Sequence, residues 1–351
     1  MSEAPAAAWS NVAVQRTPRS SPPRSTIHDV ARLAQVSTAT VSRVLTGAKP
    51  VSADLAQRVR DAAARLDYRP NPAAQVLLSG RSHTVGVVVP DLANPYFAEV
   101  LKGATPAAAE HGWRTLVADT DEDPEVEYRA ASELGRWVDG VMLCSPRMST
   151  FRLRELATKL PALVLVNRLV RRPSVAAVLV DYHQGMTQLC AHLASLGHRR
   201  LVYLQGPPHA WSDGQRRRAL RTAAGRGLDL VQIPCGSTAP DGHRVAEEAL
   251  GHKPTAIVAF NDYVALGVLS RLTELGVAVP DDVSVTGFDD IPLSALTPPG
   301  LTTVAVPKRT VGRLAWQRLA TEGTGASTTA INVPVELAVR GSTAPPRRGR
   351  R

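Results

Sequence analysis

From about residue 80 onward, short apolar runs alternate with segments of helical spacing. Such buried strands interleaved with helices are typical of parallel sheets built from right-handed crossovers, and this many strands predicts an α/β body with two parallel sheets. The apolar runs are Val85–Val89, Thr115–Ala118, Val141–Cys144, Leu163–Val166, Val175–Val180, Leu201–Leu204, Ala256–Phe260 and Val283–Val285, and the helical stretches include Tyr96–His111, Gln184–Leu196, Asp241–Leu250 and Asp262–Leu275.

Before residue 80 the pattern is helical and contains no strand-like run. Three segments, 25–34, 37–45 and 52–66, predict a small domain of three helices, with Ser25 or Thr26 capping the first. The positions predicted to face inward are Ile27, Val30, Leu33, Ala34, Val41, Val44, Leu45, Leu55, Val59, Ala62, Ala63 and Leu66. A core of this size is too small to hold an enzyme site.

The second segment, which Ser37 can cap, leaves a small polar face outward. Thr38, Ala39, Ser42 and Arg43 lie on this face. It fits a DNA major groove, where an arginine bonds guanine with two hydrogen bonds and small side chains meet the thymine methyl.

A fourth, short helix is predicted between the three-helix domain, called the head below, and the α/β body. Asn71 is a good N-cap, Pro72 suits the first helical position, and Gly80 ends the helix. It spans about two turns, below the roughly 12–15 residues at which an isolated helix becomes marginally stable in water. We therefore expect it to fold only when something packs against it, which would make residues 70–82 a switch.

The formal net charge of +10 is concentrated at the two ends of the chain. Residues 1–84 hold 11 Lys and Arg against 5 Asp and Glu, the tail from Arg340 adds 5 Arg, and the body between them is close to neutral. Clustered cations suit phosphate contacts, although a protein with merely basic tails explains the charge equally well. Residues 1–24 and 341–351 are too poor in apolar side chains to fold alone and are expected to be disordered.

Other chemistry is not indicated. The chain contains no Gly-rich phosphate loop, nucleophile elbow or kinase signature, so we expect no enzyme and no cofactor. His183, Cys190 and His192 do not share one helix face, so a metal site is not expected either. The cysteines, odd in number, suggest reduced thiols, and without a signal peptide or membrane span the expected location is the cytoplasm.

Polar residues follow several of the predicted strands. Open α/β sheets bind ligands at the carboxyl ends of their strands, so this pattern predicts a site there. The polar turn after the first strand contains Asn94, with Tyr96 and Phe97 behind it, and the residues after later strands are Asn167, Arg168, Asp181, Asn261, Asp262, Asp289 and Asp290.

Three dense motifs resemble the lactose/galactose repressor (LacI/GalR) family. They are Thr26-Ile27-x-Asp29-Val30-Ala31, Val36-Ser37-x-x-Thr40-Val41-Ser42-Arg43-Val44-Leu45 and Tyr68-Arg69-Pro70-Asn71, and the resemblance runs from about Thr26 to Arg340. It implies a helix-turn-helix head at 25–69, a hinge helix at 70–82, and a two-lobed, periplasmic-binding-protein-like body at 83–340. It also implies a homodimer on a near-palindromic DNA operator, with Leu77 inserted into the minor groove beside Ala74. The DNA-binding residues that this implies are Thr26, Ser37, Thr38, Ala39, Thr40, Ser42, Arg43, Asn71, Ala74 and Leu77.

The body carries two further signatures similar to those of this family, at 259–267 and 280–290. Together with the turn after the first strand, the resemblance implies an effector site of sugar type, with planar side chains bonding hydroxyls and an aromatic ring against the sugar face. Two alternatives stay open: Phe97 belongs equally to a core, and Arg216 lies in an Arg216–Arg218 run that also suits a solvated helix face. The candidate residues are Asn94, Tyr96, Phe97, Arg168, Asp181, Trp211, Arg216, Asn261 and Asp289.

The chain departs from the family pattern at two places. Gln35 stands where the family usually has Gly, in a turn that favours a positive φ, and Ala219-Leu220 replaces a Gly-Phe pair near Arg216. The resulting hypothesis is a transcription regulator, expected to be a repressor, whose operator affinity is controlled by a sugar or sugar derivative. A solute-binding protein and an enzyme on the same body are the rival hypotheses. Because the tail lacks heptads, a dimer is favoured over a tetramer.

Overall fold

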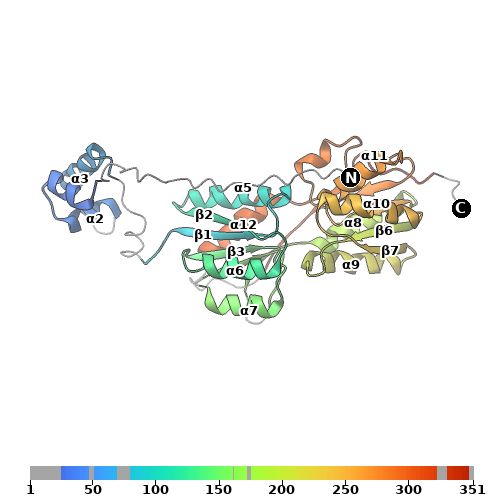
Figure 1. The fold of residues 1–351 in the computed structure, drawn as a ribbon, viewed down its shortest axis with the longest axis horizontal. Coiled ribbons are helices and arrows are strands. Elements are labelled where there is room, and N and C mark those ends of the chain that lie inside the picture. Colours follow the sequence, from blue (N-terminus) through green and yellow to red (C-terminus); the bar gives the residue numbers. More distant parts are fainter. Residues whose placement is uncertain are drawn as a thin grey trace, which may run out of the picture. The chain divides into compact units, whose positions relative to one another are not determined.

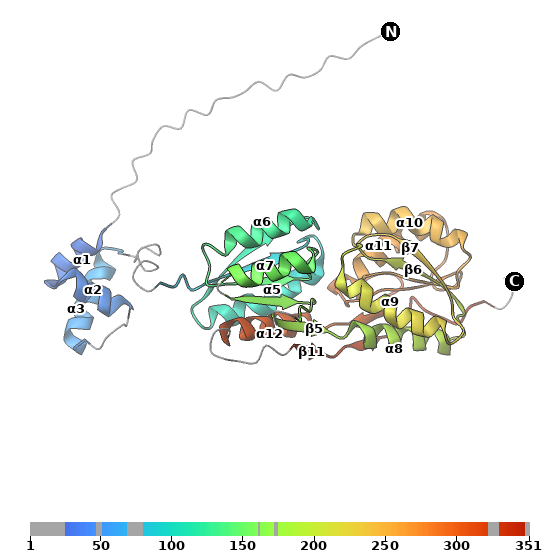
Figure 2. The same ribbon diagram turned by 90° about the horizontal axis from the view of Figure 1, so that it is seen from below.

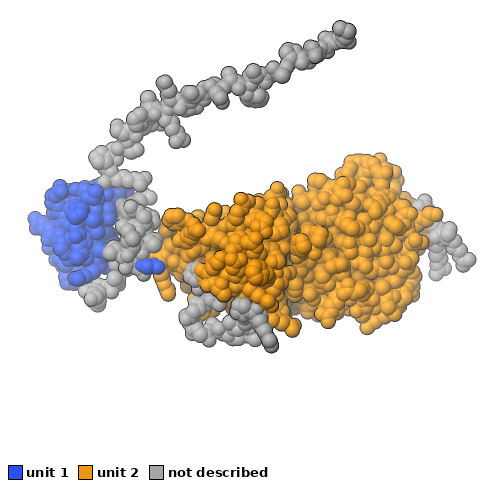
Figure 3. Space-filling view, turned by 60° about the horizontal axis from the view of Figure 1, so that its bottom comes forward, with its two compact units in different colours: residues 1–80 blue, residues 81–351 orange. Residues whose placement is uncertain are grey.

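The computed structural model describes residues 25–46, 51–68, 80–160, 162–171, 175–321 and 330–347. The chain separates into two compact units, residues 1–80 and 81–351 (Figure 3). Each unit is built around its own core, and no helix of the described residues is long and apolar enough to cross a membrane.

The first unit contains three short helices around a small apolar core. They are α1 (Ile27–Ala34), α2 (Thr38–Thr46) and α3 (Ala53–Arg65). Val30, Val41 and Val59 are fully buried at their centre. Leu33, predicted to face inward, is instead 44% exposed.

The turn between α1 and α2 requires an unusual backbone conformation. Gln35 ends α1 with φ 55° and ψ 48°, in the left-handed region, and its N–H bonds the carbonyl groups of Ala31 and Arg32. The positive φ expected at this position is therefore present, although the residue is not glycine. At the other end of α1, the Thr26 hydroxyl and the Asp29 carboxylate bond each other's backbone N–H groups in a capping box.

The second unit has two lobes, each with a parallel sheet (Figures 1 and 2). The first sheet has the order β11-β5-β4-β3-β1-β2, and all its neighbouring strands are parallel. Its strands are β1 (Thr84–Val89), β2 (Arg114–Asp119), β3 (Gly140–Cys144), β4 (Leu163–Val166), β5 (Ala176–Val180) and β11 (Ile331–Val333).

Helices cover both faces of this sheet. On one face lie α5 (Pro95–Ala109) and α12 (Lys308–Thr321), and on the other lie α6 (Pro124–Leu134) and α7 (Thr150–Lys159) (Figure 2). Strand β1 serves both faces, since Val85 and Val87 join the first core and Val88 joins the second. This two-sided burial is why the strand is an unbroken apolar run.

The second lobe has a smaller sheet with the order β7-β6-β8-β9, again parallel. Its strands are β6 (Arg200–Gln205), β7 (Asp229–Pro234), β8 (Ala256–Val258) and β9 (Ser284–Thr286), and its helices are α8 (Tyr182–Ser195), α9 (Trp211–Ala224), α10 (Ala239–Gly251) and α11 (Asp262–Glu274). Helices α10 and α11 approach so closely that a Cβ at Gly267 would lie 1.8 Å from the Ala239 carbonyl oxygen.

The chain passes between the lobes three times. It leaves the first sheet after β5 to enter α8, returns through β10 (Thr303–Ala305) to α12, and leaves again after β11 to form β12 (Glu336–Ala338), which pairs with β10. The sequence pattern does not predict β7, β10, β11 or β12. The last three contain only three residues each, too few for periodicity to identify.

Residues 341–347 pack against the second lobe, whereas their composition predicts a disordered tail. Ser342 is fully buried, and its hydroxyl donates to the Val285 carbonyl at 2.6 Å and accepts from the Thr302 N–H at 2.8 Å. Farther along, the Ala344 carbonyl lies 3.0 Å from Nε2 of His198. The body therefore extends beyond residue 340, and hydrogen bonds from Ser342 and Ala344 to the second lobe hold this segment in place.

Candidate functional site

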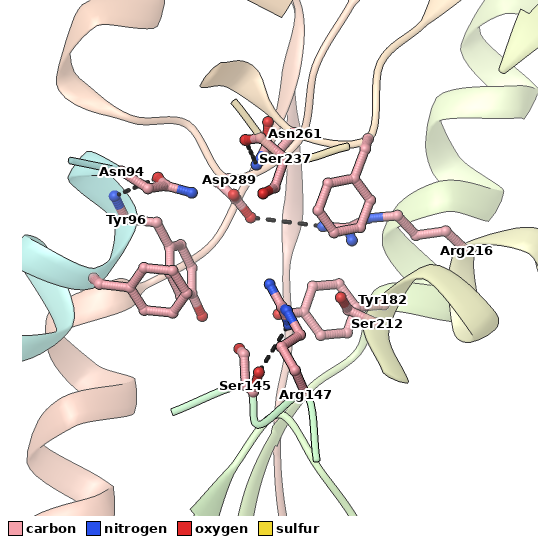
Figure 4. A pocket seen from close by; sticks show the side chains of 12 residues that line it. Asn94, Tyr96, Ser145, Arg147, Tyr182, Ser212, Arg216, Ser237, Asn261 and Asp289 are labelled. Atoms are coloured by element: carbon pink, nitrogen blue, oxygen red, sulfur yellow. Dashed lines mark hydrogen bonds and ion pairs between the residues drawn. The ribbon is translucent and has the colours of Figure 1, made fainter. Parts of the chain in front are cut away.

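A small cavity lies where strand ends of the two lobes meet (Figure 4). The space left between its side chains is about 20 Å³, enough for about one water molecule. Polar and aromatic side chains line it, namely Asn94, Tyr96, Phe97, Ser145, Arg147, Tyr182, Ser212, Arg216, Ser237, Phe260, Asn261 and Asp289.

Several of the turns at this edge are held in the left-handed region. Ser145 follows β3 with φ 49°, Asn167 follows β4 with φ 58°, and Asp289 follows β9 with φ 114°. Non-glycine residues pay about 1–3 kcal/mol for such conformations, which concentrate at functional sites. The turns also organise side chains, since Asn167 Nδ2 donates to Tyr96 Oη at 2.8 Å and to Ser145 Oγ at 3.1 Å.

Arg216 and Asp289 form the centre of the cavity. Arg216 Nη2 lies 3.7 Å from Asp289 Oδ1, and the two side chains are 2% and 8% exposed. The guanidinium carbon of Arg216 is 4.1 to 4.5 Å from the ring centroids of Tyr182, Phe260 and Phe288. Among the described residues, none bonds the buried Nε and Nη1 atoms of Arg216, so two donor groups remain for a ligand.

Burial controls the protonation of this centre. It raises the pKa of Asp289 to about 7, against the opposing effect of the Arg216 guanidinium. Burial also raises the pKa of Tyr182, again against Arg216. This rise moves the titration of Asp289 toward neutral pH; the ionised carboxylate only accepts hydrogen bonds, whereas the protonated carboxyl can also donate one.

A second arginine lies on the wall that the first lobe contributes. Arg147 forms a two-pronged salt bridge with Glu122, through Nε to Oε2 and through Nη2 to Oε1 at 2.9 Å, and its Nη1 donates to the Ser145 carbonyl at 2.8 Å. Behind it, the buried Glu127 carboxylate accepts the N–H groups of Arg147 and Met148, and burial raises the pKa of Glu127 to about 7.

The structure brings together six of the nine side chains predicted for an effector site, namely Asn94, Tyr96, Phe97, Arg216, Asn261 and Asp289. Phe97 was assigned either to the effector site or to a core, and both assignments hold, since it lines the cavity and belongs to the apolar core. Arg216 is buried and not on a solvated face. The Ala219-Leu220 departure leaves α9 continuous, with both residues buried.

Arg168, Asp181 and Trp211 do not line the cavity. Arg168 Nη2 donates to Thr150 Oγ1 at 3.0 Å, and Asp181 Oδ1 caps α8 by accepting the Gln184 N–H at 2.9 Å. The Trp211 ring centroid lies 6.5 Å from that of Tyr182. Arg168 and Asp181 follow strands β4 and β5, as predicted, and Trp211 begins helix α9, but the three side chains make these other contacts instead of lining the cavity.

The sequence analysis missed six of the lining residues: Ser145, Arg147, Tyr182, Ser212, Ser237 and Phe260. Ser145 and Ser237 follow strand ends, as the predicted residues do. Ser237 lies beyond β7, a strand that the sequence pattern did not predict, so Ser237 could not be recognised as a strand-end residue. No motif distinguishes Arg147 or Ser212.

The predicted DNA-reading face lies on α2 and the turn before it. Ser37, Ala39 and Arg43 are exposed, while Thr38, Thr40 and Ser42 are half-buried. Ser37 Oγ accepts the Thr40 N–H at 3.1 Å and so caps the helix, as predicted. Thr26 is exposed before α1. The predicted hinge residues Asn71, Ala74 and Leu77 lie outside the described residues.

Two family profiles match the chain. The profile described as bacterial regulatory proteins, lacI family, matches residues 26–71, and the profile of a periplasmic binding protein-like domain matches residues 190–343. The HTH-type transcriptional regulator GalS of Salmonella typhimurium is 35% identical, over 85% of this chain and 89% of its own length. The HTH-type transcriptional repressor CytR of Escherichia coli is 32% identical, over 91% and 96%.

Solved structures give the same result for the fold. A Lac repressor dimer bound to operator and the anti-inducer ONPF has a TM-score of 0.82 and 26% identity, covering 91% of this chain and 99% of that chain. A complex of the transcriptional regulator CelR with cellobiose has a TM-score of 0.67 and 27% identity, covering 91% and 100%.

Proposed function

The chain belongs to the lacI family of bacterial regulatory proteins and is a DNA-binding transcription regulator, and we propose that a sugar or sugar derivative bound in its cavity controls its affinity for operator DNA. Regulators of this family are not enzymes, and we expect no turnover of the sugar. The regulator is expected to act in the cytoplasm, where its DNA is, and to act as a repressor.

The Arg216–Asp289 centre carries the sugar proposal. Arg216 offers the buried donors Nε and Nη1, which no described residue bonds, and Asp289 offers the acceptor Oδ1, which lies 3.7 Å from Nη2 of the same guanidinium. A hydroxyl that accepts from the guanidinium while donating to the carboxylate would bridge this gap, and neighbouring hydroxyls on one ring satisfy both groups at once. The Phe260 and Tyr182 rings supply apolar surface for the C–H face of a sugar. CelR, with its cellobiose, supports the same ligand class.

The size of the cavity links binding to movement of the lobes. About 20 Å³ cannot hold a sugar ring, so the side chains from the two lobes must separate to admit one. A ligand that binds one arrangement of the lobes more tightly shifts the population toward it. Coupling free energies between two sites of about 1–3 kcal/mol are typical of allosteric proteins in general, and a coupling of this size would change operator affinity five- to 150-fold.

The DNA-reading proposal rests on the exposed face of α2. We propose that a homodimer places this helix in successive major grooves of a near-palindromic operator, with Ser37, Ala39 and Arg43 at the bases. The proposed roles of Thr26, Thr38, Thr40 and Ser42, and of the hinge residues Asn71, Ala74 and Leu77, follow from the family motif. The operator-bound Lac repressor dimer supports this arrangement.

The sugar proposal is tested by ligand-induced thermal stabilisation of the full chain against a panel of monosaccharides, disaccharides and their derivatives. A ligand at 100 times its Kd adds about 2.7 kcal/mol to the unfolding free energy. We expect a hit with the natural protein, at least a tenfold weaker Kd for Arg216→Met, and no change for the exposed neighbour Arg218→Met. Stabilisation that survives Arg216→Met would remove the cavity from the proposal.

The DNA proposal is tested by selecting binding sites from a random DNA pool. A near-palindromic consensus is expected, and its binding should change when the sugar is added. If no sequence is enriched, the basic head binds DNA only through its phosphates and without sequence preference.

A further inference from the structure

The Glu122 carboxylate, which does not itself line the cavity, touches a wall residue from each lobe. In the first lobe it holds the Arg147 guanidinium through both carboxylate oxygens. In the second lobe, Ser237 Oγ donates to Glu122 Oε1 at 3.0 Å. Arg147 and Ser237 are both cavity residues, so one side chain joins the two walls.

The backbone places Glu122 for this contact. It lies in the turn between β2 and α6, where Asp121 has φ 48° and Glu122 has φ 59°, both in the left-handed region. The Glu122 N–H bonds the Pro90 carbonyl at 2.7 Å at the end of β1, and the next residue, Asp123, caps α6. The turn is therefore fixed at both sides, and its strained conformation projects the carboxylate toward the other lobe.

Ser237 is equally well anchored on its own side. It is 5% exposed, and it precedes the capping box in which Thr238 and Asp241 begin α10. Its carbonyl accepts from Asn261 Nδ2 at 3.1 Å, and Asn261 Oδ1 in turn caps α11. A continuous set of hydrogen bonds thus leads from Arg147 through Glu122 and Ser237 to Asn261 (Figure 4 shows the Ser237–Asn261 part).

We propose that Glu122 is a positioning residue that couples closure of the lobes to the shape of the cavity. When the lobes are together, its carboxylate orients Arg147 on one wall and holds Ser237, and through it Asn261, on the other. When the lobes separate, the Ser237–Glu122 bond breaks and Glu122 retains Arg147 alone. A bond to a charged acceptor in a mostly buried setting is one of the stronger types, so its loss should favour the separated arrangement.

The proposed sugar would act through this Glu122 contact, but the contact itself does not depend on the sugar. The decisive test is therefore done without ligand. Hydrogen–deuterium exchange with mass spectrometry on the full chain measures how often the protected amides of each lobe open. Peptides that cover residues 120–123 and 145–148 report on the first lobe, and peptides that cover 235–238 report on the second.

Ser237→Ala removes the bond while leaving the Glu122–Arg147 salt bridge intact. We expect exchange to rise about tenfold in the first lobe, at residues 120–123 and 145–148. Among the described residues, the Ser237 side chain is hydrogen-bonded to these two segments through Glu122 alone. The matched control Ser195→Ala removes an exposed hydroxyl of the same lobe, which bonds only the His192 carbonyl among the described residues, and should leave the first lobe unchanged.

Glu122→Gln provides the reciprocal measurement, with Glu125→Gln, an exposed carboxylate of the same segment, as its control. It should raise exchange at 235–238 in the second lobe. In the Glu122→Gln background, where the uncharged amide oxygen is a weaker acceptor, Ser237→Ala should add less at 120–123 than it does in the natural protein. A merely structural role of either residue predicts changes confined to its own lobe and additive effects.

Changes confined to the mutated lobe, or independent effects in the double variant, would overturn the proposal. If Glu122→Gln fails to fold, the Ser237→Ala comparison alone decides it, since that substitution leaves every charge in place. Failure to find a sugar would leave these exchange results unaffected, so the two proposals fail separately.

Discussion

Arg216 Nη2 lies 3.7 Å from Asp289 Oδ1, and both residues are nearly inaccessible to solvent. This distance is too long for a hydrogen bond and short enough for strong electrostatic interaction. Lys308 supports the pair from behind, because its Nζ donates to the carbonyl groups of Asp289 and Asp290, each at 2.6 Å. The two charges are therefore held near each other without saturating each other's hydrogen bonds, as a ligand site requires.

Asp289 should make stability depend on pH. Because its folded pKa, about 7, exceeds its usual 3.8, the folded state binds the proton more tightly than the unfolded chain does. The resulting stabilisation is complete below about pH 3.8 and is lost as the pH rises through 7, with a slope of at most about 1.4 kcal/mol per pH unit for one proton. Buried Glu127, whose pKa is also about 7, should contribute in the same direction.

We expect Asp289→Asn to reduce the fall in unfolding free energy between pH 5 and pH 8, measured by chemical denaturation. Asp229→Asn, at an exposed carboxylate of the same lobe, serves as the control. An undiminished fall in the Asp289→Asn protein would assign the pH dependence to other groups.

Arg43→Ala should weaken binding to the selected operator by roughly 1–3 kcal/mol and change binding to random DNA little. Arg43 is exposed on α2, and in the proposed complex it bonds a guanine edge. Fluorescence anisotropy with both DNAs, at two salt concentrations, separates these contributions. Equal losses on the two DNAs would make Arg43 a phosphate contact.

Gln35→Gly should stabilise the head by about 0.5–1 kcal/mol, because glycine adopts the left-handed conformation at φ 55° without a steric cost. Gln57→Gly, at an exposed position inside α3, should destabilise it by about 1 kcal/mol. Exchange protection of the α1 and α3 amides measures both effects. Destabilisation by both glycines would mean that the Gln35 side chain outweighs the strain.

Ser342→Ala should destabilise the body by about 1–3 kcal/mol, because it leaves the buried Thr302 N–H without its acceptor. Truncation after Gly341 should cost more, since it also removes the His198–Ala344 contact. Truncation after Arg347 keeps these contacts and is the control. Thermal unfolding should show the protein truncated after Arg347 as the most stable, Ser342→Ala as intermediate and the protein truncated after Gly341 as the least stable. Equal stability for all of them would show that residues 342–347 do not hold the lobe together.

The alternation of strands and helices could be predicted from the sequence because both faces of each sheet are buried. Two-sided burial makes strands such as Val85–Val89 and Leu163–Val166 continuous apolar runs. The site could be located for a related reason: parallel strands end at one edge, so the polar residues after them, such as Asn261 and Asp289, must converge. The helix-turn-helix motif could be predicted because its capping and turn residues lie within a few positions of one another in the sequence.

Only the tertiary structure decided which strand-end side chains enter the cavity. Arg168 and Asp181 satisfy the same sequence pattern as Asn261, yet hydrogen bonds to Thr150 and to the α8 backbone direct them elsewhere. The Glu122–Ser237 bond joins residues 115 positions apart, and the packing of residues 341–347 depends on hydrogen bonds to β9 and its neighbours. Such contacts have no period or local signature, since they depend on where distant segments meet in space.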